Sequence, residues 1–281
     1  MQGFWPELLP AINQRSLVMG VLNVTPDSFS DGGLFLDPEE AVQRGLKMLE
    51  EGADIIDVGG ESTRPGAKLI SEEEELARVL PVIGALAKHA PISIDTNKSS
   101  VAEAAAEAGA SIVNDISGGN FDPAIREVVA KHGLGYVMMH ARAKPETMQK
   151  GEWHYEGGVV EAVRLALQQA AELAVRAGIP KGHLMVDPGF GFGKTLEENC
   201  QLLEHLEDFQ TLGFPVLVGT SKKSFLGALT GKTVENRGFA TAASVALAAA
   251  RGAKVVRVRD VAATCDVLRV VDACTSPLIC D

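Results

Sequence analysis

Short apolar runs recur along the chain, and each run ends in a polar or charged residue. The runs consist mainly of Val, Ile, Leu and Met without alternating polar positions, which is typical of parallel strands covered on both faces. They cover about residues 18–23, 54–58, 92–95, 111–115, 134–140, 184–187, 215–219 and 254–258. We therefore predict eight parallel strands.

Amphipathic stretches separate these runs and predict helices. The clearest of them cover 38–51, 72–89, 101–108 and 159–177. A glycine commonly stands between a helix and the next strand, as Gly52, Gly109 and Gly252 do. Glycine adopts the left-handed conformation that ends a helix. Strands and helices that alternate with a repeat of about 35 residues predict an α/β fold, a (β/α)8 TIM barrel; a doubly wound open sheet is the alternative.

The residues that end the apolar runs are the first candidates for a site. The carboxyl ends of the strands in a closed parallel barrel meet on one face, where the active sites of this fold lie. Long loops at 25–36, 59–71 and 141–156 leave these ends and suit segments that close on a ligand. This arrangement predicts an enzyme. The run-ending residues are Asn23, Asp57, Asp95, Asn114 with Asp115, His140, Asp187, Ser221 and Arg257.

Composition narrows the class of protein. Of 281 residues, 46% are hydrophobic, which is enough for a large core, and the net charge of −11 argues against a nucleic-acid partner. We find no signal-peptide pattern and no apolar run long enough to cross a bilayer, so we expect a cytoplasmic protein with no membrane partner. No break in composition suggests a second domain. We expect one barrel over 17–276, with a lead-in at 1–16 and a tail at 277–281.

The four cysteines show no C-x-x-C spacing. We therefore expect reduced thiols rather than disulfides or metal ligands. They are Cys200, Cys265, Cys274 and Cys280.

Two long loop motifs carry a family resemblance. Residues 23–33 are Asn-Val-Thr-Pro-Asp-Ser-Phe-Ser-Asp-Gly-Gly, and residues 57–67 are Asp-Val-Gly-Gly-Glu-Ser-Thr-Arg-Pro-Gly-Ala. Shorter motifs follow at 94–96, 113–116, 138–140, 187–194, 219–224 and 256–261. From about 18 to 271, the chain resembles the dihydropteroate synthases, pterin-binding enzymes of folate biosynthesis.

That resemblance implies a transferase and its reaction. 6-Hydroxymethyl-7,8-dihydropterin pyrophosphate would condense with p-aminobenzoate to give 7,8-dihydropteroate and pyrophosphate. The resemblance also implies Mg²⁺ as a cofactor, a homodimer and inhibition by sulfonamides.

Three strand ends suit a flat heterocycle with N–H and amino edges. Asp95, Asn114 and Asp187 can converge, and carboxylates accept hydrogen bonds while Asn both donates and accepts. Taken singly, each residue could equally serve only to end its strand. The resemblance implies a pterin site made of Asp95, Asn114, Asp187, Lys223, Met139, Gly219 and Arg257.

A pyrophosphate group needs positive charge near it. Several cationic residues follow strands or lie in the long loops, and the Arg guanidinium matches phosphate oxygens. These cations are Arg64, Lys222, Lys223, Arg257 and Arg259. The resemblance implies a pyrophosphate site made of Asn23, Thr63, Arg64, Arg257 and Arg259, with Asn23 as the protein ligand of Mg²⁺.

The second substrate and the loops complete the set that the resemblance implies. Thr63, Pro65, Phe192 and Ser221 would line the p-aminobenzoate site. Phe29, Asp31 and Arg64 would belong to loops that close over both substrates. Asp57 is expected to support the second loop from below, with a direct role in the site as the alternative.

The last strand departs from the family pattern. The family has Arg-x-His there, and this chain has Arg257-Val258-Arg259. Arginine can also bind pyrophosphate and keeps its charge at every working pH. We expect the activity to be retained. A pterin-binding paralogue without synthase activity and a pterin-dependent methyltransferase remain the alternative functions.

Two other motifs have weaker interpretations. The glycines at 189–193, followed by Lys194 and Thr195, lack the P-loop spacing because Pro188 stands where its first glycine would be. Phe190 and Phe192 are instead expected to pack on an aromatic substrate. His140 has no second His or Cys near it in the sequence, which favours a structural role over a zinc site.

Overall fold

The computed structural model describes residues 5–25, 37–62, 69–144, 147–148, 155 and 157–275. Five of the predicted site residues lie outside these ranges, and so does Cys280. Those site residues are Phe29, Asp31, Thr63, Arg64 and Pro65.

Eight parallel strands close into a barrel in chain order, from β1 next to β2 around to β8 next to β1. The closed order confirms the predicted (β/α)8 barrel and excludes the open sheet. The strands are β1 (Leu17–Asn23), β2 (Ile55–Gly59), β3 (Ile92–Asp95), β4 (Ile112–Asp115), β5 (Gly135–Met139), β6 (Leu184–Asp187), β7 (Val216–Val218) and β8 (Ala253–Val258).

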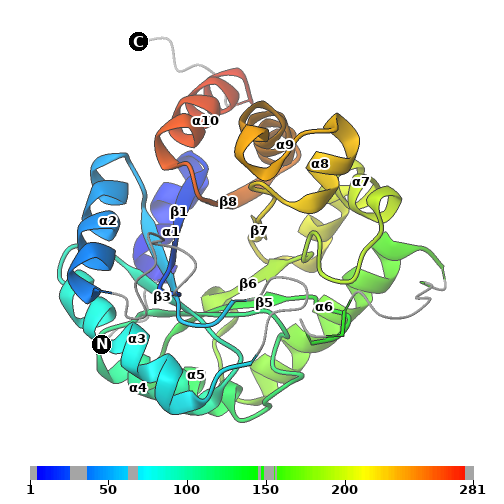
Figure 1. Ribbon diagram of the computed structural model, residues 1–281. Coiled ribbons are helices and arrows are strands. Elements are labelled where there is room, and N and C mark those ends of the chain that lie inside the picture. Colours follow the sequence, from blue (N-terminus) through cyan, green and yellow to red (C-terminus); the bar gives the residue numbers. More distant parts are fainter. Residues whose placement is uncertain are drawn as a thin grey trace.

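Helices surround the barrel (Figure 1). Several begin at the side-chain caps that their sequences favour, and Thr195 and Glu198 form a reciprocal capping box at the start of α7. The helices are α1 (Trp5–Gln14), α2 (Pro38–Glu50), α3 (Glu72–Leu86), α4 (Ser99–Glu107), α5 (Ile125–His132), α6 (Val159–Arg176), α7 (Leu196–Glu204), α8 (Ser224–Thr230), α9 (Gly238–Ala250) and α10 (Val261–Thr275). Short 3-10 turns cover η2 (Lys181–His183), η3 (Leu206–Leu212) and η4 (Val234–Asn236).

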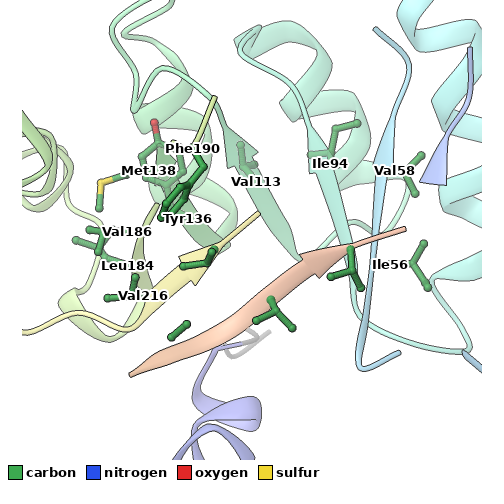
Figure 2. Packing of buried hydrophobic residues seen from close by; sticks show 14 of the residues in the cluster. Ile56, Val58, Ile94, Val113, Tyr136, Met138, Leu184, Val186, Phe190 and Val216 are labelled. Carbon is green, nitrogen blue, oxygen red and sulfur yellow. The ribbon is translucent and has the colours of Figure 1, made fainter. Parts of the chain in front are cut away.

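The strands are mainly apolar up to their carboxyl ends because both of their faces are buried. On β2, Ile56 and Val58 belong to the larger cluster between strands and helices, part of which is shown in Figure 2. Ile55, the neighbour of Ile56, belongs instead to a second cluster, which fills the barrel interior together with Met19 and Val255. Alternate residues of one strand therefore serve two cores.

The segment predicted as a simple lead-in forms helix α1. Its Ile12 is 2% exposed and packs in the interior cluster with Leu17 and Met19 of β1. These residues lie in the amino-terminal half of the strand. Helix α1 therefore closes the end of the barrel opposite the strand ends that carry polar groups.

We expect Ile12→Ala to lower the free energy of unfolding by about 2–5 kcal/mol, because it removes buried methyl groups and leaves a cavity. Urea-induced unfolding measures this loss. Val270→Ala is the matched control, since Val270 is 66% exposed on α10. The control should change stability by no more than about 0.5 kcal/mol. Equal losses in the two variants would show that α1 adds nothing to the core.

Candidate functional site

Polar groups from four strands meet in one hydrogen-bonded cluster. Asp95 of β3 and Asn114 of β4 are partners in the strand register. The amide nitrogen Nδ2 of Asn114 donates to Asp57 of β2 at 3.2 Å. Arg257 of β8 donates to Asp57 through Nε at 2.6 Å and to Asp95 through Nη2 at 2.5 Å. The structure places Asp57, which was expected to support the second loop or to act directly, at the centre of this cluster.

Burial dominates the electrostatics of the cluster. It raises the pKa of Asp95 to about 7, although the charge of Arg257 acts in the opposite direction. Burial alone would lower the pKa of Arg257, but the carboxylates of Asp57 and Asp95 raise it instead. The second carboxylate oxygen of Asp95, Oδ1, is buried and has no hydrogen-bond partner. A buried acceptor of this kind is costly unless a ligand supplies a donor.

Asp187 ends β6 beside Met139 of β5, to which it is paired in register. Its carboxylate accepts a hydrogen bond from the backbone N–H of Gly189 at 2.7 Å. Burial raises its pKa, while the charge of Lys223 opposes that rise. Met139 packs with Phe192 in a small apolar cluster next to these polar groups.

Lys223 lies against the loop that follows β6. Its Nζ donates to the carbonyl of Phe190 and lies 4.8 Å from the centre of the Phe192 ring. Burial lowers its pKa to about 8, and Asp187 acts to raise it. A cation above an aromatic ring is an attractive contact. Phe192 is therefore held from one side by Lys223.

Lys194 organises the same loop, and the sequence analysis gave it no such role. Its Nζ donates to the carbonyl of Gly189 at 2.7 Å, to that of His140 at 3.1 Å and to that of Phe192 at 3.3 Å. The ring nitrogen Nδ1 of His140 lies 3.1 Å from the same ammonium. Burial and then Lys194 lower the pKa of His140 to about 2, so its ring is neutral. A side chain at Gly189 is excluded, because its Cβ would lie 2.1 Å from the carbonyl oxygen of His140.

A cavity of about 550 Å³ opens above these groups. The cavity lining does not include Asp95, Asn114, Asp187 or Met139. Asp95 is bonded directly to Arg257, which lines the cavity, and Asn114 is linked to Arg257 through Asp57. Seven predicted site residues do line it. They are Asn23, Phe192, Gly219, Ser221, Lys223, Arg257 and Arg259.

The cavity wall is rich in cations in an otherwise acidic chain. Besides Lys222, Lys223, Arg257 and Arg259, it includes Arg237, which the sequence analysis missed because Arg237 precedes α9 and not a strand end. Ser224, the first residue of α8, also lines it and was not predicted. The hydroxyl of Ser221 accepts a hydrogen bond from the backbone N–H of Arg259 at 3.3 Å and so joins β7 to β8. A cavity with this lining suits an anion.

A resident metal would need donors that the described residues do not supply by themselves. No group of three or more His, Cys, Asp or Glu side chains in the described part of the chain is arranged to hold an ion. Asn23 lies at the cavity and its amide oxygen is a neutral donor. One such donor fits a hydrated ion that takes its other oxygen ligands from substrate phosphates and water.

Two other predictions have definite outcomes. Asp115, which shares a strand end with Asn114, is engaged within the protein: its carboxylate accepts from Ser117 and Gly119 and, at 2.8 Å, from the hydroxyl of Tyr136. Among the described residues, Cys200, Cys265 and Cys274 form no disulfide.

The chain belongs to a known class of protein. The family model described as pterin binding enzyme matches residues 19–259, and the chain belongs to that family. Within the family it belongs with the dihydropteroate synthases. It is 48% identical over 267 residues to the dihydropteroate synthase of Mycobacterium leprae, covering 91% of this chain and 92% of that protein.

Solved structures agree with this assignment. The dihydropteroate synthase of Xanthomonas albilineans with 4-aminobenzoic acid is 46% identical, with a TM-score of 0.86, and the match covers 93% of this chain and 94% of the other. The enzyme of Yersinia pestis in a sulfonamide drug complex is 43% identical, with a TM-score of 0.87 and the same coverage of both chains. Among the residues that the structure describes, no helix is both long and apolar enough to cross a membrane.

We expect Arg257→Met to lower the free energy of unfolding by about 3–5 kcal/mol, because Asp57 and Asp95 would be left buried without their counterion. Arg251→Met is the matched control: Arg251 forms a more exposed pair with Glu207 at 3.8 Å. An exposed pair contributes at most about 1 kcal/mol. Chemical denaturation of both variants compares the losses, and a similar loss in each would contradict a central role for Arg257.

Proposed function

We infer that the chain condenses 6-hydroxymethyl-7,8-dihydropterin pyrophosphate with p-aminobenzoate, giving 7,8-dihydropteroate and pyrophosphate in folate biosynthesis. The observation that carries this inference is the buried, unpartnered oxygen of Asp95 beside a cavity lined with cations. One end of this site suits a heterocycle that donates hydrogen bonds. The other end suits a polyanion. A pterin pyrophosphate has both parts.

The pterin ring is assigned to the buried polar cluster. Asp95 and Asp187 would accept from ring N–H groups and the exocyclic amine, and Asn114 would both donate and accept. Lys223 would reach the carbonyl or a ring nitrogen. Met139 and Gly219 would border the ring. Arg257 contributes indirectly, because two of its guanidinium nitrogens are bonded to Asp57 and Asp95 and hold both carboxylates in place.

The pyrophosphate is assigned to Asn23, Arg257 and Arg259, together with Thr63 and Arg64 from outside the described residues. In the reaction the C–O bond to pyrophosphate breaks, and the C–N bond to the aryl amine forms as that nitrogen loses a proton. No protein nucleophile is needed. The cations stabilise the negative charge that develops on the leaving group. Because Arg259 is charged at all working pH, this stabilisation does not depend on a histidine proton.

Mg²⁺ is assigned to Asn23 and the substrate phosphates. When bound there, the ion would supply further positive charge to the leaving group.

The p-aminobenzoate is assigned to Phe192 and Ser221, with Thr63 and Pro65. The contacts of Lys194 and Lys223 fix the loop that carries Phe192, which supports a preformed aromatic wall. Phe29, Asp31 and Arg64 are assigned to loop closure over both substrates. The sulfonamide complex of the Yersinia pestis relative supports sulfonamides as inhibitors. They are assigned to this same part of the site.

The chain is further proposed to be a cytoplasmic homodimer with no nucleic-acid or membrane partner. Exposed apolar side chains on neighbouring elements support self-association, among them Phe239 at 94% exposure, at the start of α9. Leu229, Val234 and Leu247 are also exposed on α8, η4 and α9. An acidic chain with a net charge of −11 supports the absence of nucleic acid.

A pyrophosphate-release assay tests the function. We expect turnover only when the pterin pyrophosphate, p-aminobenzoate and Mg²⁺ are all present, with dihydropteroate identified by mass. Arg259→His is the companion variant and should keep the activity. Pterin binding without turnover in the wild-type chain, together with turnover in Arg259→His, would make this chain a silent paralogue.

We expect pterin affinity to weaken by on the order of tenfold between pH 7.5 and pH 5.5. Burial raises the pKa of Asp95 to about 7, and the protonated acid is a weaker acceptor that turns one oxygen into a donor facing the ring N–H groups. Calorimetry with 6-hydroxymethylpterin, which lacks the pyrophosphate, measures this change. Asp95→Asn should bind more weakly and with a much flatter pH profile, and any remaining slope would belong to Asp187. An unchanged slope in Asp95→Asn would remove Asp95 from the pterin site.

A further inference from the structure

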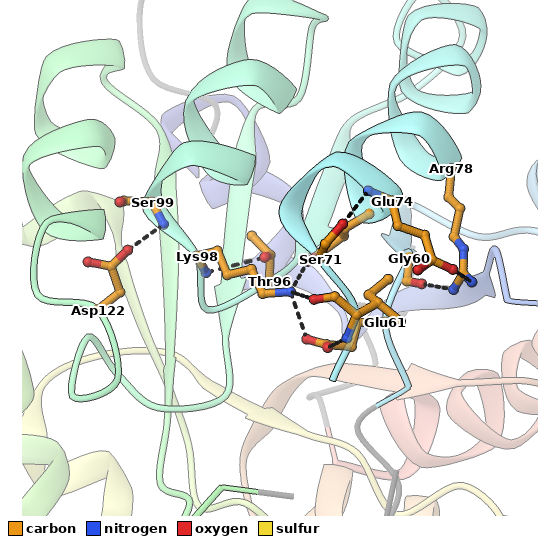
Figure 3. A network of polar contacts seen from close by, with 11 residues as sticks. Gly60, Glu61, Ser71, Glu74, Arg78, Thr96, Lys98, Ser99 and Asp122 are labelled. Atoms are coloured by element: carbon orange, nitrogen blue, oxygen red, sulfur yellow. Dashed lines mark hydrogen bonds and ion pairs between the residues drawn. The ribbon is translucent and has the colours of Figure 1, made fainter. Parts of the chain in front are cut away.

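Lys98 connects both sides of the loop that follows β2. It lies at the start of α4, beyond the end of β3. Its Nζ donates to Glu75 of α3 at 2.7 Å and to the carbonyl of Ile70 at 3.1 Å, and it lies 3.2 Å from the carboxylate of Glu61 (Figure 3). An ammonium has three N–H donors, and three acceptors surround this one.

Glu61 and Ile70 are also bonded to each other. The carboxylate oxygen Oε1 of Glu61 accepts a hydrogen bond from the backbone N–H of Ile70 at 2.7 Å. Ile70 is therefore held twice, through its N–H by Glu61 and through its carbonyl by Lys98. These contacts fix the distance between the two ends of the loop.

The start of the loop, at Gly60, packs closely against α3. Arg78 donates to the carbonyl of Gly60 at 2.7 Å and pairs with Glu74 at 2.5 Å (Figure 3). A Cβ at Gly60 would lie 2.8 Å from the side chain of Val79. This close approach of loop and helix requires glycine and leaves residue 61 little freedom to move.

The cluster holds two carboxylates against one ammonium. The side chain of Glu75 is 1% exposed, that of Glu61 8% and that of Lys98 17%. Burial raises the pKa of Glu75, and Lys98 opposes that rise. The oxygen Oε1 of Glu75 is buried without a hydrogen-bond partner. Buried charge clusters of this kind are weak evidence for stability, so a role in geometry explains this one better.

The residue next to Glu61 belongs to the functional cavity. Ser62 lines it together with Asn23 and Arg259, at the end assigned to the pyrophosphate. We propose that Lys98, acting through Glu61 and Ile70, is a positioning residue for the cavity wall that receives the pyrophosphate half of the substrate. The proposal rests on the function inferred above and adds to it a residue that is expected to touch neither substrate.

Two variants test the proposal at different cost to folding. Lys98→Met removes all three contacts but leaves two buried carboxylates without a counterion. Glu61→Gln leaves one ammonium and one carboxylate, a balanced pair, and is expected to fold. The Gln side-chain amide can offer its oxygen either to the Ile70 N–H or to the Lys98 ammonium, and its NH₂ group then faces the other donor. Lys131→Met is the control, because Lys131 forms a comparable 2.5 Å pair with Glu103 but is 67% exposed.

The measurement is the affinity advantage that the pyrophosphate confers. Calorimetry gives the dissociation constants of 6-hydroxymethylpterin and of its pyrophosphate, each with Mg²⁺. The first constant divided by the second measures how much the pyrophosphate group adds to the affinity. In Glu61→Gln we expect this ratio to fall by about tenfold, because a small displacement of the groups that position a ligand weakens binding strongly. The dissociation constant of 6-hydroxymethylpterin itself should stay within about twofold of the wild-type value. Lys131→Met should leave both constants unchanged. Exchange of the Ile70 amide hydrogen should be faster in Glu61→Gln than in wild type.

The outcomes separate the proposal from the function beneath it. If the wild-type chain binds the pterin pyrophosphate no more tightly than 6-hydroxymethylpterin, the proposed function itself is wrong. If Glu61→Gln keeps the same gain in affinity from the pyrophosphate group as wild type, Lys98 and Glu61 form only a structural ion pair. This holds whatever the change in thermal stability. An equal loss for both ligands would likewise overturn a role confined to the pyrophosphate half.

Discussion

Closure of the barrel forces the carboxylates of neighbouring strands into one buried place, and the guanidinium of Arg257 makes that arrangement possible. It bonds Asp57 and Asp95 at once, from a strand that lies 200 residues beyond Asp57 in the chain. Without this counterion, the two carboxylates would repel each other in a site with little water. Asn114 and the free oxygen of Asp95 depend on that neutralisation for their positions.

The buried cluster and the cavity above it are chemically different. At Asp95 and Asp187, acceptors are buried and their pKa values are raised by burial. Around Arg259, Lys222 and Arg237, cations line the cavity wall of a chain whose net charge is −11. The two environments together suit a ligand that joins a donor-rich ring to a polyanion.

Lysines placed behind the site hold its loops. Lys194 fixes the loop after β6 from below, through the carbonyls of Gly189 and Phe192. Lys98 fixes the two sides of the loop after β2 through Glu61 and Ile70. In each case one ammonium satisfies several acceptors from separate segments. The barrel is rigid, and these contacts restrict the motion of the loops that follow β2 and β6 relative to it.

The sequence by itself determined the α/β class of the fold and the chemistry that is available at the strand ends. Uninterrupted apolar runs indicate strands buried on both faces, and eight of them with intervening helices favour a barrel. The observed order of the strands then excluded an open sheet. The polar residues that end these runs follow from the same pattern, so Asp95, Asn114 and Asp187 could be named in advance. The family motifs then identified the class of reaction.

Only the tertiary structure decided how these side chains are paired. Asp57 lies between Asn114 and Arg257, because the pairing of strands β1 with β8 sets which strand ends adjoin. Arg237, Lys194 and Lys98 do not end strands, and a pattern of strand ends cannot find them. Helix α1 is part of the core because the closed barrel has an interior, in which Ile12 packs. Hydrogen bonds and ion pairs depend on distances across the fold, and the linear pattern of apolar and polar residues does not contain those distances.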